Sequence, residues 1–210
     1  MAGLGTPYKI KELVKIGYLL SISRYRWRIG ANSFVIPIVQ PVNWLPICSW
    51  QKVTINIIDD SLRETGVTFS QGIREKIYTY TLGHPYELQV LCSNLYESQL
   101  QGRVDETEWD QAFKNALWEL GRDYFEVLYR KASSREETVL LALAEAKTDL
   151  SISETTERVG AENSSFPLRN VKHFLYRLSN KGLIKRTDRK SFEIPDPMLR
   201  EYILQKSLIR

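Results

Sequence analysis

The chain has 210 residues, of which 43% are apolar and 26% are charged, so it is neither disordered nor collagen-like. Its two cysteines, Cys48 and Cys92, are too few for a disulfide framework, and we therefore expect a reducing, cytoplasmic location. The lysines in the first segment, MAGLGTPYKIKELVK, interrupt the apolar run that a secretory signal needs. The cysteines do not have the spacing of zinc ligands with His84 and His173, so no metal site is predicted.

The net charge of +4 is divided unevenly along the chain. Residues 1–60 carry seven basic and three acidic side chains, whereas residues 61–164 carry eleven basic and eighteen acidic ones. Residues 165–210 carry eleven basic and four acidic side chains. A carboxy-terminal segment this basic indicates an anionic partner.

A run of 23 uncharged residues follows Arg28 and is long enough to cross a bilayer. Three prolines inside it would break helix hydrogen bonds that lipid cannot replace, so we expect no membrane span. The run is more typical of extended chain, with a short strand over residues 34–39 and then a proline-broken loop. Residues 53–58 (VTINII) are compatible with another strand or with the start of a helix.

From about Ser61 the apolar spacing becomes helical. Apolar residues at i, i+4 and i+7 predict a helix over 73–81, which Gly83 ends. Pro85 suits the first turn of a second helix, which we expect to end at Gly102.

An acidic segment, 105–110, favours the positive N-terminal end of a third helix. The apolar stripe of that helix consists of Trp109, Ala112, Phe113, Ala116 and Leu117. A further helix is predicted around 124–129, and residues 131–135 (KASSR) are the best candidate for a linker.

Three further helices are predicted in the last part of the chain. Ser134 and Glu137 have the spacing of a capping box at the start of the first one. The second is short and is expected to end at Gly160. The third extends from Leu168 to a stop at Gly182, with Leu168, Val171, Phe174, Leu175 and Leu178 directed inward.

Two short β segments follow, LIKR and SFEI, separated by the polar turn TDRK. A closing helix is predicted over about 197–204. Three helices followed by a β-hairpin is the order of a winged helix-turn-helix domain.

The third of these helices and the hairpin carry basic side chains outside the apolar stripe. The candidates for nucleic-acid binding are Arg169, Lys172, His173, Arg177, Lys181, Lys185, Arg186, Arg189 and Lys190. Such a helix can enter a major groove while its cations neutralise phosphates. The alternative is a solvated charged face on a module that packs against protein. Nothing in the sequence separates base recognition from phosphate binding.

Three stretches in this order carry a family resemblance: 81–92 (TLGHPYELQVLC), 135–186, and 192–202 (FEIPDPMLREY). Over about residues 60–205 the chain resembles the C-terminal half of the archaeal- and bacterial-type STAND/AAA+ ATPases, relatives of origin-recognition ATPases. In that family the first stretch belongs to a helical lid whose Gly-x-Pro turn packs near the adenine. The resemblance implies that His84 and Pro85 lie near a nucleotide.

The chain also departs from the family. It has no G-x-x-x-x-G-K-[ST] segment, whose backbone amides and lysine hold phosphates. ATP or ADP with Mg²⁺ is therefore expected only where a P-loop core is present. Residues 55–60 (INIIDD) superficially resemble a Walker B strand. We interpret them instead as a helix start capped by Asp59, Asp60 or Ser61.

These patterns together predict a mainly α protein: a helical lid-like bundle followed by a winged helix-turn-helix domain with a short β-hairpin. Residues 1–60 would be an irregular segment and the remnant of an AAA+ core, residues 61–131 the lid-like domain, and residues 132–210 the winged helix. The predicted function is DNA binding by this portion of an ATPase, with no hydrolysis and no catalytic residue of its own. The alternative is a regulatory protein–protein module of a signalling ATPase, which binds a protein partner or the AAA+ core.

Overall fold

The computed structural model describes residues 24–26, 35–37, 47–99, 101–162, 165–187 and 190–208, with side chains from Trp50 onward except Glu162. The chain is mainly helical and forms two compact units, Met1–Asp110 and Gln111–Arg210. The division into functional domains at residues 131 and 132 stays a prediction. Within the described residues, no helix is both long and apolar enough to span a bilayer.

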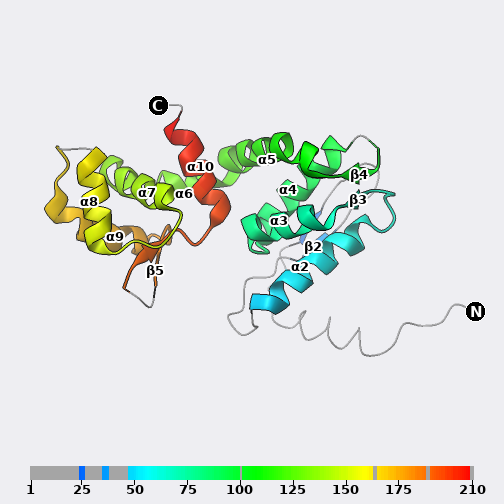
Figure 1. Cartoon of the computed structure of the whole chain (residues 1–210), viewed down its shortest axis with the longest axis horizontal. Helices are drawn as coiled ribbons and strands as arrows, with labels where there is room; N and C mark the ends of the chain where they lie inside the picture. The colour runs from blue at the N-terminus through cyan, green and yellow to red at the C-terminus, as the bar shows by residue number, and fades with distance from the viewer. Residues whose placement is uncertain are drawn as a thin grey trace, which may run out of the picture. The chain divides into compact units, whose positions relative to one another are not determined.

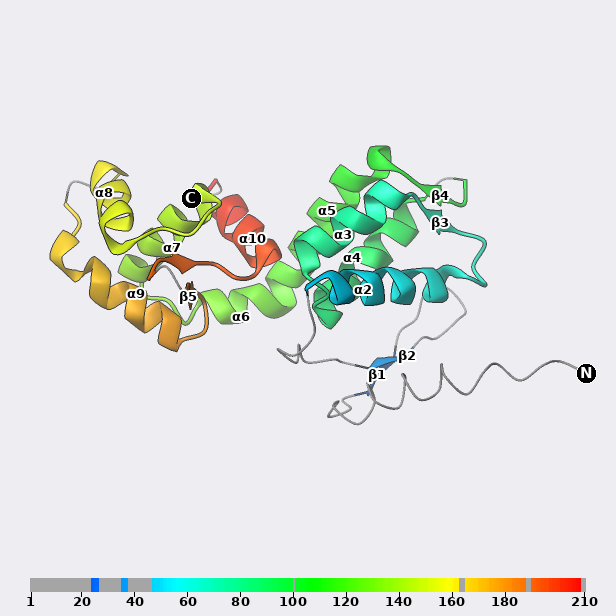
Figure 2. The same ribbon diagram turned by 60° about the horizontal axis from the view of Figure 1, so that its bottom comes forward.

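In the first unit, α3 packs against both α2 and α4 (Figures 1 and 2). The elements in chain order are β1 (Arg24–Arg26), β2 (Val35–Pro37), α2 (Ile47–Leu62), β3 (Thr68–Phe69), α3 (Gln71–Thr81), α4 (Pro85–Ser98), β4 (Arg103–Val104) and the start of α5 (Glu106–Leu120). The strands β1 and β2 pair antiparallel, and β2 lies within the strand predicted over 34–39.

The helix α2 corrects the interpretation of residues 55–60. Thr54, Ile58 and Leu62 are buried at intervals of four residues, which is the stripe of a helix. The hydroxyl of Thr54 donates to the carbonyl of Trp50 at 2.9 Å, so a polar residue is accommodated inside that stripe. Asp59 and Asp60 therefore lie near the end of a helix, and the prediction that they cap the start of one was wrong.

The turn between α3 and α4 forms as the sequence predicts. Leu82 and Gly83 have positive φ values of 47° and 77°, and Pro85 is the first residue of α4. A Cβ at Gly83 would lie 2.8 Å from the Oγ1 of buried Thr54, so this turn closely approaches α2. The predicted apolar residues Ile73 and Ile77 are fully buried.

A parallel pair of two-residue strands, β3 and β4, was not predicted. The amide of Thr68 donates to the carbonyl of Gly102 at 2.8 Å, and that of Ser70 donates to Val104 at 3.1 Å. Segments this short do not show the alternation by which strands are recognised. The pair brings the start of α3 beside the start of α5. Gly102 lies in the turn before β4, since α4 already ends at Ser98.

In the second unit, α7 packs against α8, α9 and α10 (Figure 2). The elements are a π-helical turn (Gly121–Phe125), α6 (Glu126–Tyr129), α7 (Ser134–Ala146), α8 (Ile152–Glu162), a 3₁₀ turn (Leu168–Asn170), α9 (Val171–Asn180), β5 (Lys185–Arg186), β6 (Phe192–Glu193) and α10 (Pro197–Ser207). The strands β5 and β6 form the predicted antiparallel hairpin.

Two helix ends differ from their predictions. Helix α7 is capped by Ser133, whose amide donates to Glu136 at 2.7 Å, so the capping pair lies one residue before the predicted Ser134 and Glu137. Because Ser133 and Ser134 are adjacent, as are Glu136 and Glu137, the sequence allows either capping pair. The structure has the pair Ser133–Glu136, in which Glu136 is buried. Helix α8 continues through Gly160, because a residue without a side chain leaves space there for Leu168.

The C-terminal helix α10 is held by a carboxylate on α6. Glu126 accepts a hydrogen bond from the hydroxyl of Tyr202 at 2.6 Å and one from the ammonium of Lys206. These donors, with the Lys206 contact contributing most, lower the pKa of Glu126 to about 2. Tyr202 also lies against Gly121, where a Cβ would be 2.7 Å from its ring.

Replacing Gly83 with alanine should destabilise the first unit by two effects. The left-handed backbone costs about 1 kcal/mol for a residue with a Cβ, and overpacking against Thr54 adds about 1–3 kcal/mol. Gly66→Ala is the matched control, because Gly66 has φ of 72° and no atom within 4 Å of a Cβ. Urea unfolding followed by circular dichroism measures both variants. Equal losses in the two would contradict the close approach of the turn to α2.

Candidate nucleic-acid interface

The helix α9 presents two faces of opposite character. Its inner face buries Val171, Phe174, Leu175 and Leu178, as predicted. Leu168 does not continue this face: it lies in the 3₁₀ turn and is 40% exposed, so its prediction as an inward residue was wrong. Because a 3₁₀ turn has fewer residues per turn than an α-helix, Leu168 does not line up with the buried face of α9.

The outer face of α9 carries an exposed row that begins in the 3₁₀ turn. This outer row consists of Arg169, the adjacent Lys172 and His173, and Tyr176, so that its steps are one helical turn apart. Among the described residues, neither Arg169 nor Lys172 forms an ion pair with a carboxylate. Their charges are therefore available to solvent or to an anionic partner.

A second basic pair, Arg177 on α9 and Lys181 at its C-cap, is turned toward α7. The Nε of Arg177 lies 3.0 Å from Glu136 Oε1, and the Nζ of Lys181 lies 2.6 Å from Glu136 Oε2. Glu136 is fully buried, whereas the side chains of Arg177 and Lys181 are 45% and 25% exposed. We call these three residues the Glu136 clamp.

The surroundings of Glu136 keep its carboxylate charged. Burial raises the pKa of this group, but the ammonium of Lys181 and the donors of Ser133 outweigh burial and hold the pKa below the ordinary value. The same carboxylate accepts the amide of Ser133 and so caps α7. One buried group thereby fixes the start of α7 and two side chains of α9.

The hairpin adds three exposed cations, Lys185, Arg186 and Lys190. The segment between α7 and α8 supports it, because Leu150 and Phe192 exchange both backbone hydrogen bonds, at 2.8 and 2.9 Å. Arg189, the remaining candidate in the hairpin, lies outside the described residues.

The nine predicted interface residues thus divide by structural environment. Arg169, Lys172, His173, Lys185, Arg186 and Lys190 are exposed on the outer row or the hairpin. Arg177 and Lys181 belong to the Glu136 clamp. Sequence reasoning missed Glu136, since its distance of more than forty residues from Lys181 leaves no local signal. The one local signal was the position of Glu136 at the start of α7, where a carboxylate is stabilised by the helix dipole.

The turn at His84 and Pro85 contains a second buried carboxylate. His84 is the N-cap residue of α4, and its Nδ1 lies 3.5 Å from Oε1 of Glu87. Glu87 is 1% exposed and lies in the first turn of α4, where the helix dipole favours a negative charge. The proximity of His84 and Pro85 to a nucleotide stays a prediction.

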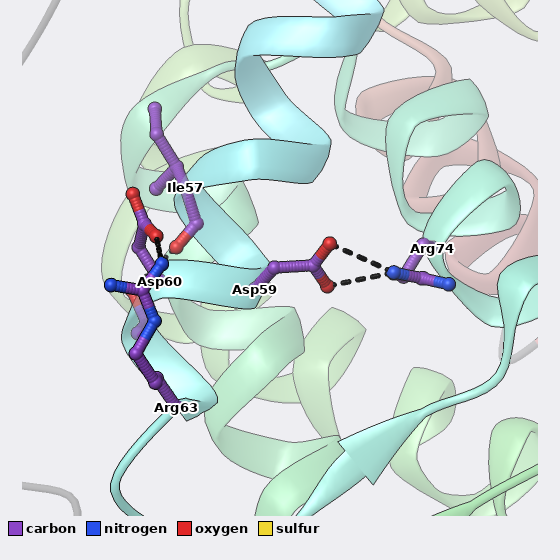
Figure 3. Close-up of polar contacts among 6 residues, drawn as sticks. Ile57, Asp59, Asp60, Arg63 and Arg74 are labelled. Atoms are coloured by element: carbon purple, nitrogen blue, oxygen red, sulfur yellow. Dashed lines mark hydrogen bonds and ion pairs between the residues drawn. The ribbon is translucent and has the colours of Figure 1, made fainter. Parts of the chain in front are cut away.

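The carboxylates of the INIIDD segment are engaged in ion pairs (Figure 3). Both oxygens of Asp59 accept from the same Nη1 of Arg74 on α3 at 2.8 Å, and Asp60 lies 2.5 Å from Arg63. A Walker B pair would instead leave its oxygens to a magnesium ion. Among the described residues, no group of three metal-ligating side chains is assembled. The segment does not fit a magnesium site.

Comparison with known proteins gives a likeness of fold. No protein-family profile and no curated protein matches the chain. A solved structure of a Walker-type ATPase from Pyrococcus abyssi is similar, with a TM-score of 0.58 and 17% identity over 79% of this chain. The chain spans 43% of that protein, less than half its length. At this identity the likeness concerns the fold alone, which is consistent with an archaeal ATPase-related fold.

Replacing Glu136 with glutamine should destabilise the second unit by about 1–3 kcal/mol, because two cations lose their charged acceptor. The pKa of Glu136 is lowered in the folded state, so its contribution is complete above the ordinary value of 4.5 and is lost as the pH falls through the lowered pKa. The difference between wild type and E136Q should therefore shrink in acid. Urea unfolding at several pH values measures it, with Glu137→Gln as the control. A difference independent of pH would contradict an ionised Glu136.

Proposed function

We propose that this chain is the lid and winged-helix portion of a Walker-type ATPase and that it binds DNA through α9 and the β5–β6 hairpin. The observation that carries the proposal is the outer row of α9 continued by the cations of the hairpin. Five lysines and arginines, at positions 169, 172, 185, 186 and 190, are exposed on these two neighbouring elements. Residues of the Glu136 clamp are not part of the proposed interface.

The proposed binding should depend on salt concentration in a way that can be calculated from the number of cations involved. Each phosphate neutralised by a lysine or arginine releases condensed counterions from DNA. If all five cations contact phosphates, the logarithm of the binding constant should fall with the logarithm of salt concentration with a slope of about −4.5. Inclusion of Arg177 and Lys181 would steepen that slope to about −6.3.

The structural likeness supports the ATPase part of the proposal. A Walker-type ATPase shares the fold over 79% of this chain, and the chain has no P-loop sequence. ATP or ADP with Mg²⁺ would then be held by a separate P-loop core, with the turn at His84 and Pro85 near the base. The chain itself does not hydrolyse ATP in this proposal.

A matched pair of substitutions tests the proposed interface. Lys172→Met removes a cation of the outer row, and Lys181→Met removes one from the Glu136 clamp with the same change in side chain. We expect K172M to reduce the salt slope by about one unit and K181M to leave it almost unchanged. Fluorescence anisotropy of a labelled DNA duplex of mixed sequence, titrated at several salt concentrations, gives both slopes.

The protein-interaction alternative makes the opposite prediction for the same titration. A regulatory module that binds protein would show a weak DNA affinity that K172M does not alter. Circular dichroism of each variant confirms that the fold is retained before slopes are compared. A binding constant indifferent to salt would overturn the proposed function.

A further inference from the structure

Tyr176 is the aromatic member of the outer row and joins α9 to the hairpin. Its side chain is 37% exposed. Its ring meets the ring of Phe192 edge-on, with centroids 5.7 Å apart and an interplanar angle of 86°. Phe192 is fully buried in β6, so this contact fixes the position of Tyr176 against the core.

Arg186 lies over the same ring. The guanidinium carbon is 6.0 Å from the centroid of Tyr176, within the range of a cation–π contact. Arg186 is directly opposite Phe192 in the hairpin register, so both side chains lie on one face of the hairpin. Tyr176, Phe192 and Arg186 thus form one connected group at the junction of helix and hairpin.

Arg186 differs in this respect from the other exposed cations. Among the described residues, no aromatic ring lies beneath Arg169, Lys172, Lys185 or Lys190. A lysine or arginine free to rotate follows a phosphate wherever it lies, and so carries no sequence information. A guanidinium stacked on an aromatic ring loses less freedom for each hydrogen bond it forms, and its planar fork suits a pair of acceptors.

We propose that Arg186, positioned by Tyr176, is the base-reading residue of the interface and that it binds the paired acceptors of guanine at the major-groove edge. The O6 and N7 atoms of guanine are the most common bidentate target of arginine in DNA. This inference rests on the proposed DNA binding and adds to it the source of sequence preference. Phosphate also offers paired acceptors, and the experiment separates the two.

The test is selection of bound duplexes from a pool with a randomised core, followed by sequencing. Wild type should enrich sequences with a guanine at one defined position. Arg186→Lys keeps the charge but loses the planar fork, and should reduce the preference for that guanine by about tenfold. Tyr176→Leu should do the same, whereas Tyr176→Phe keeps the ring and should retain the preference.

Lys185→Met is the control within the same strand. It should lower the salt slope by about one unit while the enriched sequence stays unchanged. If R186K weakens all sequences equally, Arg186 binds phosphate and the inference fails. If wild type binds DNA in a salt-dependent way but enriches no sequence, the inference fails and the proposed function stands. Absence of salt-dependent binding would overturn the proposed function itself.

Discussion

The C-terminal unit depends on one buried carboxylate. Glu136 accepts the amide that begins α7 and pairs with Arg177 and Lys181 of α9, so it joins the central helix to the helix that faces outward. A buried charge is costly unless it is paired and hydrogen-bonded. The Ser133 amide and Lys181 both donate to Oε2 of Glu136, while Arg177 forms an ion pair with Oε1, which accepts no hydrogen bond from the described residues. The buried apolar face of α9 sets the rotation of the helix about its axis, and the ion pair of Arg177 with Glu136 is compatible with that rotation.

Long periodic elements could be predicted from the sequence, because the apolar residues that specify them lie close together. Helix α9 was predicted from its apolar stripe, Val171, Phe174, Leu175 and Leu178. The start of α4 was predicted from Pro85 after Gly83. The hairpin followed from two short apolar segments around a polar turn. In α2, by contrast, the polar Thr54 occupies a core position and obscured the helical period.

The omissions have a common physical origin in contacts between distant segments. The pairing of β3 with β4 and the bridge between Leu150 and Phe192 depend on backbone groups, which leave little trace in side-chain pattern. The Glu136 clamp joins residues far apart in the chain. The sequence therefore showed which residues on and after α9 are basic but not which of them form an ion pair with a distant carboxylate.

The number of basic residues in the sequence is therefore larger than the number of basic side chains that an anionic partner could contact. Of the eleven basic residues after position 164, Arg177 and Lys181 are paired with Glu136 and Lys206 with Glu126, while Arg200 donates to the carbonyl of Ile194. These four stabilise the fold. The exposed cations that remain in the described part of this segment lie on the 3₁₀ turn, α9 and the hairpin, where the Tyr176–Arg186 contact joins helix to strand. The available positive charge is thus gathered on the 3₁₀ turn, α9 and the hairpin, and that concentration, rather than the net charge of the segment, favours nucleic acid as the partner.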